Sequence, residues 1–373
     1  MFTALRARLS QARFDAQEAS GALGDLGTFL PLLLGMAVQN GLDLGVALFF
    51  AGALNLLTGL VFALPMAVQP MKAIAAVALT QGLTVPQILA AGMLVSAIVT
   101  VLGLLGWVDR LARWIPDSVV RGLQLGLGFS LALKGLELAA APGLDRWLLA
   151  LPAALLGWWL LAGRRLPVAL LLFGAGLLVT VLRHPESLQG LRLGLHLPHG
   201  VPIPAADWMT AFTKAALPQV PLTLLNSVVA VCALARDLKP EAAPSEKKVA
   251  LSVGMMNLLT GWFGGMPMCH GAGGLAGQWA FGARTQGSIL LLGAAKVLLA
   301  LLFGSTLMAL AAAFPKALLG VMLLFSGLGL AETSRKAANV PVMLLTAAGC
   351  IALGYLPGVL IGLAATFLGR KEA

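Results

Sequence analysis

Two Pro- and Gly-rich breaks interrupt long apolar runs, and their residues could bind an anion. The first is PMAVQPMK at 65–72 and the second is PMCHGAGG at 267–274, and each precedes a short Ala- and Gly-rich stretch. Pro interrupts a helix that precedes it but is well tolerated in the first turn of a new helix. Gly lets the backbone come close to a ligand or to another helix. The pattern predicts a helix start at each break, with free N–H groups and about half a positive charge there.

Polar side chains lie around these breaks and within two other apolar runs. Asp25 and Thr28 lie in the first run, and Gln219 and Asn226 lie in a run of the second half. We expect the anion to be held by side chains and by backbone N–H groups of both helix starts. The candidate residues are Thr28, Gln69, Met71, Lys72, Gln219, Asn226, His270, Gly271, Ala272 and Gly273.

Three charged or titratable residues keep two interpretations each. Asp25 is either the partner of Lys72 in a neutral buried pair or the residue that couples transport to H+ or Na+. His270 is either an anion ligand or a hydrogen-bonded packing residue. Lys296, like Gln278, is expected to serve packing or an interface.

The composition indicates which elements must position these residues. The chain is 59% hydrophobic and only 11% charged, and the stretches 44–71 and 86–108 contain no charged residue. About 20 such residues cross the hydrocarbon layer as a helix. The sequence therefore predicts an all-α polytopic membrane protein. The Lys and Arg residues behind the net charge of +10 lie between the apolar runs, not in one patch, which argues against nucleic-acid binding.

Cutting the apolar runs at Pro, Gly and charge clusters gives about fourteen transmembrane segments. Most Lys and Arg residues then fall in loops on one side, which is the side expected to be cytoplasmic. Both termini are predicted to be cytoplasmic and the protein to be multi-pass in the cell (inner or plasma) membrane. The segments are 22–39, 43–63, 66–81, 86–106, 117–139, 145–163, 166–183, 214–235, 247–264, 268–283, 286–311, 315–331, 337–353 and 355–369.

An internal repeat divides the chain into two halves. NLLTGLVFALPM at 55–66 and NLLTGWFGGMPM at 257–268 are identical at seven of twelve positions. Coincidence in a biased composition is the alternative. The predicted halves are 1–183 and 209–373, joined by an extracytoplasmic connection at 184–208. Seven segments in each half would insert the second half upside down, and such inverted repeats with a site between them are typical of secondary transporters.

The same stretches resemble a known family. GALGDLGTFLP, PMAVQPMKAIAAVA, LPQVPLTLLNSVVAVCALARDL and GMPMCHGAGGLAGQWAFGAR are similar to the molybdate-transporter branch of the sulfate-permease (SulP) superfamily. The resemblance implies a seven-plus-seven inverted fold like that of uracil permease, with half-helices as segments 3 and 10. Segments 1–4 and 8–11 would form a core domain, and segments 5–7 and 12–14 a gate domain.

The sequence departs from that family in two ways. Many relatives carry an acidic residue where Asn226 stands, so no carboxylate can couple transport there. The chain ends at Ala373, without the soluble regulatory domain that sulfate permeases append.

The expected function is secondary active transport of a tetrahedral oxyanion by alternating access, with the core moving against the gate like an elevator. Molybdate is the leading substrate, and sulfate and tungstate remain alternatives. An anion channel could use the same helix starts. An intramembrane enzyme would need a nucleophile and base, and the four histidines offer little, so no catalytic residue, metal or cofactor is expected. The expected partners are the lipid bilayer and a second copy in a homodimer.

Overall fold

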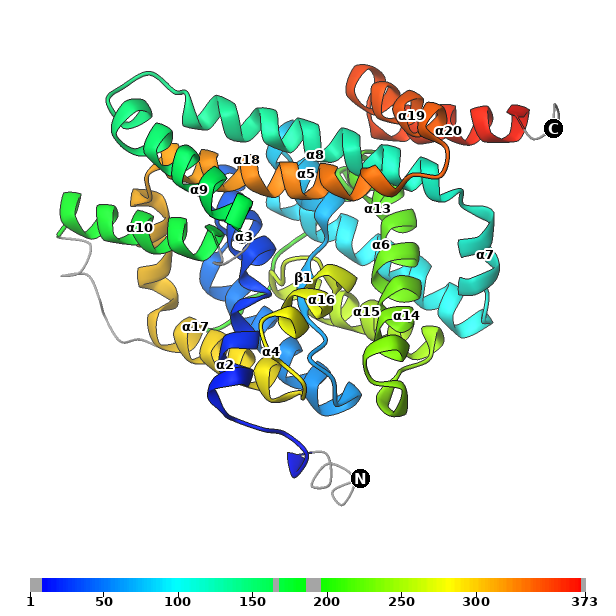
Figure 1. The fold of residues 1–373 in the computed structure, drawn as a ribbon, viewed down its shortest axis with the longest axis horizontal. Helices are drawn as coiled ribbons and strands as arrows, with labels where there is room; N and C mark the ends of the chain where they lie inside the picture. The colour runs from blue at the N-terminus through cyan, green and yellow to red at the C-terminus, as the bar shows by residue number, and fades with distance from the viewer. Residues whose placement is uncertain (1–8, 164–167, 186–195, 370–373) are drawn as a thin grey trace.

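The computed structural model is mostly helical and describes residues 9–163, 168–185 and 196–369 (Figure 1). In the first half, one short strand interrupts the helices. The elements are α2 Ala16–Leu23, α3 Leu26–Asn40, α4 Leu44–Phe62, β1 Val68–Pro70, α5 Lys72–Gln81, α6 Val85–Leu105, α7 Val108–Trp114, α8 Asp117–Ala139, η1 Arg146–Ala150, α9 Leu151–Gly163 and α10 Val168–Arg183.

The second half begins with one long helix, Ala205–Leu238, which contains two π-helical turns. Its parts are α12 Ala205–Ala211, η2 Phe212–Ala216, α13 Leu217–Leu222, η3 Thr223–Val229 and α14 Ala230–Leu238. The remaining elements are η4 Pro240–Ala242, α15 Glu246–Thr260, η5 Gly261–Phe263, β2 Met268–His270, α16 Ala272–Ala280, α17 Gly287–Ala313, α18 Lys316–Glu332, η6 Thr333–Lys336, α19 Val340–Leu353 and α20 Tyr355–Gly369.

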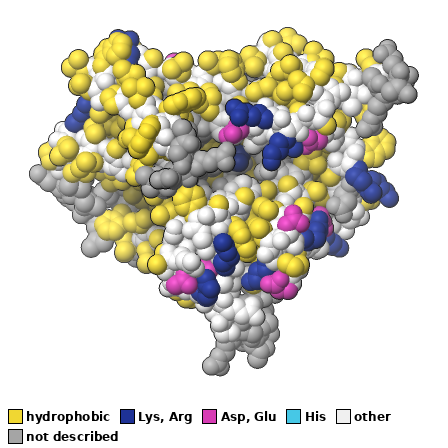
Figure 2. Space-filling model, viewed as in Figure 1, with side chains coloured by type: hydrophobic (Ala, Val, Ile, Leu, Met, Phe, Trp, Pro, Cys, Tyr) yellow, Lys and Arg dark blue, Asp and Glu magenta, His cyan; other side chains and the backbone are white. Residues whose placement is uncertain are grey.

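The helices have the length and apolar character of a membrane protein. Among the described residues, 5 helices are long and apolar enough to cross a bilayer, or 6 if α2 and α3, which meet at a 46° bend, form one span. Large apolar side chains, including Trp114, Trp158 and Trp159, remain exposed, and they cover much of the face in Figure 2. Lipid would cover such a surface. The count of fourteen spans stays a prediction.

Most predicted segments coincide with helices, and the eighth differs in an informative way. The predicted segment 117–139 is α8, residue for residue. The eighth segment, predicted as 214–235, lies in a longer helix, Ala205–Leu238. This helix begins directly after Pro204, a residue that is common at helix starts. Of the predicted connection at 184–208, residues 186–195 lie outside the described residues, as do both ends of the chain.

Both predicted breaks are present, each as a three-residue strand followed by a short helix. The two strands pair antiparallel, with Val68 opposite His270 and Pro70 opposite Met268. Pairing supplies hydrogen bonds to backbone groups that would otherwise be unsatisfied inside the membrane. The breaks from the two halves therefore meet at the centre of the molecule (Figure 1).

The Asn of the repeated NLLTG motif has the same contact in both halves. The Asn55 side-chain oxygen accepts a hydrogen bond from the Val68 N–H at 3.2 Å, and that of Asn257 accepts one from the Met268 N–H at 2.6 Å. The strand begins 13 residues after Asn55 but 11 after Asn257. The halves thus differ by two residues between helix and strand, which the gap-free sequence match does not reveal.

The main helix pairs join one half to the other. α4 packs along α17, α6 along α15, and α8 along α18. A Cβ added at Gly128 or Gly135 of α8 would lie 2.6 Å from the carbonyl oxygen of Gly327 or Gly320 in α18, respectively. Small residues let these two backbones approach closely, as is common between membrane helices. The division into core and gate domains stays a prediction.

Candidate functional site

A narrow cavity lies where the two breaks face α8, α18 and the long helix. It has room for about 10 Å³, roughly one water. Lys72 and Leu330 also line a neighbouring space of about 20 Å³ with Thr28, Leu32, Leu131 and Ser326. Five predicted ligands besides Thr28 therefore meet here: Gln69, Lys72, Gln219, Asn226 and Gly271.

The start of α16 is open. Its N-cap residue is Gly271, which has no side chain that could cap the helix. The first helical hydrogen bond runs from the Leu275 N–H to the Gly271 oxygen at 3.1 Å. In the part of the chain that the structure describes, nothing accepts from the N–H groups of Ala272 and Gly273. Gly273 is exposed, and a Cβ added there would meet only the Lys72 Nζ, at 3.9 Å. This helix start can therefore receive an anion beside a lysine.

Most N–H groups at the start of α5 already have acceptors. The Gln219 Oε1 accepts from the Ala73 N–H at 2.8 Å and the Ile74 N–H at 3.4 Å. The Met71 N–H donates to the Pro267 oxygen at 2.9 Å. The prediction that the Met71 N–H binds the anion is therefore wrong for this conformation, because strand pairing uses that group. Gln219 lines the cavity but acts as the cap of α5.

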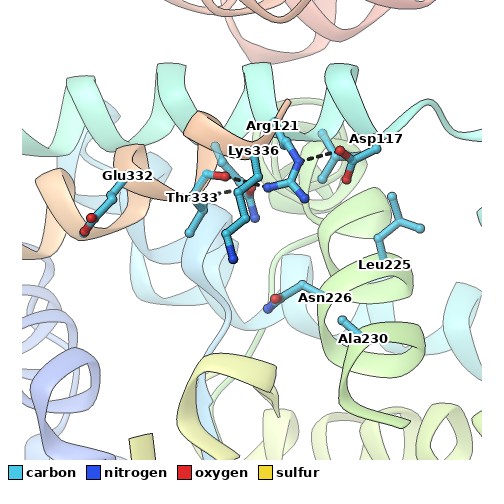
Figure 3. Close-up of a pocket in the computed structure, with 11 residues that line it drawn as sticks. Asp117, Arg121, Leu225, Asn226, Ala230, Glu332, Thr333 and Lys336 are labelled. Carbon is cyan, nitrogen blue, oxygen red and sulfur yellow. Dashed lines mark hydrogen bonds and ion pairs between the residues drawn. The ribbon is translucent and has the colours of Figure 1, made fainter. Parts of the chain in front are cut away.

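The long helix presents Asn226 to the cavity through a π-helical turn. Pro221 and Pro218 lie five and eight residues before it, and Pro221 lacks the N–H for a regular helical bond. The chain widens into η3, and such turns recur at functional sites. The Asn226 amide lines both the narrow cavity and a larger cleft beside it, where Figure 3 shows it projecting from this helix.

Asp25 is paired with Lys296 and not with Lys72, which was its partner in one of the two interpretations. Both side chains are buried, with the Asp25 Oδ2 3.7 Å from the Lys296 Nζ. The other carboxylate oxygen accepts from the Gln69 Nε2 at 2.7 Å. The Lys296 Nζ also lies 3.5 Å from the centre of the Phe29 ring. Lys296, which was expected to serve packing or an interface, thus contacts Asp25, and Asp25 in turn is bonded to Gln69, which lines the cavity.

His270 lies outside the cavity. Its Nε2 is 3.0 Å from the Ser252 Oγ, its Nδ1 is 3.4 Å from the Ala67 oxygen, and its ring meets Phe62 edge-on. Successive side chains of a strand point to opposite faces, so Cys269 lines the cavity and His270 faces away from it. This arrangement fits the packing interpretation of His270.

Sequence reasoning missed several residues around the cavities. Gln124 on α8 and Cys269 on β2 line the narrow cavity, and Ser326 on α18 lines its neighbour. The Ser326 Oγ is buried, with no hydrogen-bond partner in the described part of the chain. Gln124 and Ser326 are polar residues inside apolar runs, so the rule that selected Asn226 would have found them.

Solved structures share the fold. The transmembrane domain of the cyanobacterial bicarbonate transporter BicA matches with a TM-score of 0.65 and 19% identity, over 93% of this chain and 96% of that one. Murine Solute Carrier 26 family member A9, an anion transporter in the inward-facing state, matches with a TM-score of 0.71 and 15% identity, over 99% of this chain and 70% of that one. The chain therefore has the fold of these transporters.

Sequence relatives are closer. Molybdate transporter 2 of Arabidopsis thaliana is 40% identical, over 96% of this chain and 89% of its own length. Molybdate transporter 1 of Chlamydomonas reinhardtii is 36% identical, over 96% and 93%. Residues 17–131 and 211–330 match the family described as "Molybdate transporter of MFS superfamily", although the fold is that of the solute carrier 26 proteins. By these matches, the chain belongs to the molybdate transporter family.

Proposed function

We propose that this protein is a secondary active transporter of a tetrahedral oxyanion, with molybdate as its substrate. Relatives that carry the name molybdate transporter share 36–40% of its residues. The observation that carries the proposal is the open start of α16 facing Lys72.

The groups at this site are mainly hydrogen-bond donors. The N–H groups of Ala272 and Gly273, the Lys72 ammonium and the Asn226 amide can all donate to oxygen. Charge-assisted bonds to an oxyanion are stronger than neutral ones. A fully deprotonated tetrahedral dianion offers acceptors in every direction, so it suits a donor-rich site. Sulfate and tungstate share this chemistry and are the competitors to test.

Binding at this site requires movement in the proposed cycle. Room for about 10 Å³ holds one water and not an oxyanion of five heavy atoms. The cavity is walled on one side by Gln124 of α8 and Leu330 of α18. We propose that the elements carrying the breaks shift against α8 and α18, as core against gate in an elevator-like cycle. The cross-pairing of α4 with α17 and α6 with α15, and the matching contacts of Asn55 and Asn257, support an inverted repeat.

Asp25 is the proposed coupling residue, acting through Gln69. Its Oδ2 is buried and makes no hydrogen bond in the described residues, while Lys296 lies 3.7 Å away. A proton or Na+ at this oxygen would change the charge of the pair and the strength of the bond to Gln69, which lines the cavity. The coupling ion is identified by imposing an H+ gradient and a Na+ gradient in turn and measuring which of them drives molybdate uptake.

Radiolabelled molybdate uptake into liposomes containing the purified protein tests the proposal. We expect saturable uptake, competition by tungstate and sulfate, and accumulation when a proton or sodium gradient is imposed. A molybdate current that does not saturate with concentration and needs neither a proton nor a sodium gradient would indicate an anion channel instead. Liposomes that accumulate none of the three oxyanions under either gradient would contradict the proposal.

A further inference from the structure

A larger cleft adjoins the narrow cavity and has room for about 510 Å³ (Figure 3). Its walls are the first turns of α8, the η3–α14 part of the long helix, and the end of α18 with η6. Gln124 and Asn226 line both spaces. The cleft therefore adjoins the candidate site across these two side chains, and it is large enough for a hydrated oxyanion, which the narrow cavity is not.

The charges in the cleft leave one cation free. The Arg121 guanidinium is paired with the Asp117 carboxylate and also donates to the Thr333 oxygen at 2.6 Å. Glu332 lies 3.8 Å from Arg335. Among the described residues that line the cleft, Lys336 is the cation without an ion pair. Figure 3 shows its side chain reaching across the cleft toward Asn226, while Glu332 points elsewhere.

We infer that this cleft is a second anion-binding site, in which Lys336 captures the oxyanion before Asn226 and Gln124 pass it to the open start of α16. The inference rests on the proposed transport function for its substrate class. Lys336 supplies the charge, and the amides of Asn226 and Gln124 supply donors at the boundary of the two spaces. Arg121 is held by Asp117 and Thr333 and shapes the wall.

A capture site controls how often the substrate arrives, not how fast it is carried. Removing its charge should therefore raise the KM for molybdate and leave the maximal rate unchanged. One charge acting on a dianion about 6–12 Å away in water changes its local concentration about three- to tenfold. Screening lengths fall from ~30 Å at 0.01 M salt to ~3 Å at 1 M, so the effect should disappear at high salt.

The test compares initial molybdate uptake into inside-out and right-side-out membrane vesicles. Lys336→Gln should raise KM about three- to tenfold at low salt, in the orientation that exposes the cleft, with the maximal rate within about twofold of the wild-type value. Lys336→Arg should restore the wild-type KM. Lys247→Gln, which removes an exposed lysine of α15 outside the cleft, is the matched control and should change nothing.

The outcomes separate this inference from the proposed function. Gly273→Ala, which adds a methyl group at the open start of α16, should lower uptake at subsaturating molybdate by about 10²- to 10⁴-fold. If Gly273→Ala lowers uptake in this way but Lys336→Gln keeps the wild-type KM in both vesicle orientations, the capture site is refuted and the central site stands. If Gly273→Ala transports normally while Lys336→Gln raises KM, the capture site stands and the central site is refuted.

Discussion

Gly273 gives a substitution whose effects on folding and on binding should have opposite signs. A Cβ at this position meets only the Lys72 Nζ, at 3.9 Å, which is ordinary contact. Gly273 is in the first turn of α16, and its φ is not positive. Replacing a helical Gly by Ala stabilises a protein by ~0.4–1 kcal/mol, chiefly by restricting the unfolded chain. Gly273→Ala should therefore leave the melting temperature unchanged or slightly raised.

Binding should weaken strongly in the same variant. The added methyl occupies the space between the α16 start and Lys72, where an oxyanion would accept from the N–H groups of Ala272 and Gly273. A hydrogen bond to a charged group contributes ~1.5–3 kcal/mol. Loss of both bonds corresponds to ~3–6 kcal/mol, or about 10²- to 10⁴-fold in affinity. Isothermal titration of molybdate into the purified variant measures this loss, and thermal unfolding without ligand measures the stability.

Two other glycines serve as controls. A Cβ at Gly174, on the exposed face of α10, meets nothing within 4 Å, so Gly174→Ala should keep the affinity and leave the stability unchanged or slightly raised. A Cβ at Gly274 would lie 2.5 Å from Ala67, so Gly274→Ala should lower stability. Wild-type molybdate affinity in a stable Gly273→Ala protein would refute the backbone site. A Gly273→Ala protein that melts early would refute the claim that the space is open.

Four further predictions follow from the site. Lys72→Gln should weaken molybdate binding by about 10- to 100-fold in titration without eliminating it, since one charge-assisted bond is lost and the backbone donors remain. Asn226→Asp should abolish uptake because it sets a negative charge beside a dianion, whereas Asn226→Ala should only reduce it; normal uptake by the Asp variant would place η3 away from the substrate. Asp25→Asn or Lys296→Met alone should lower the melting temperature by leaving a buried charge unpaired, while the double variant should recover stability but not gradient-driven accumulation; accumulation restored in the double variant would rule out coupling at Asp25. A cysteine at Ser187, outside the described residues, should react with an impermeant thiol reagent on intact cells, and protection there would reverse the predicted topology.

The breaks were predictable because their cause is local. Pro70 cannot continue a helix from before it, and the glycines after His270 allow close backbone approach, so the sequence alone indicates where α5 and α16 begin. The repeated Asn was also visible, and the structure gives it a physical role in satisfying a strand N–H in each half. Local chain chemistry thus sufficed for the elements that form the site.

The partners of the buried charges were not predictable in the same way. Asp25 and Lys296 lie in different halves of the chain, and only the packing of α17 against α2, α3 and α4 brings them together. Lys72 was the nearer candidate in sequence, and nothing local excludes it. The cap on α5 is also non-local, since Gln219 reaches Ala73 from 146 residues away. Composition marks such residues as costly inside a membrane but does not say which of them meet.

The difference between the two helix starts has a consequence for the transport cycle. An N–H without a partner costs ~1–3 kcal/mol where it is buried, but Gly273 is exposed, so water can reach the start of α16 while the site is empty. In α5, the Gln219 side chain and the Pro267 oxygen accept from the N–H groups of Ala73, Ile74 and Met71. In α16, the N–H groups of Ala272 and Gly273 have no acceptor in the described part of the chain. We therefore expect the oxyanion to bind at the start of α16, and the start of α5 to stay capped by Gln219 through the transport cycle.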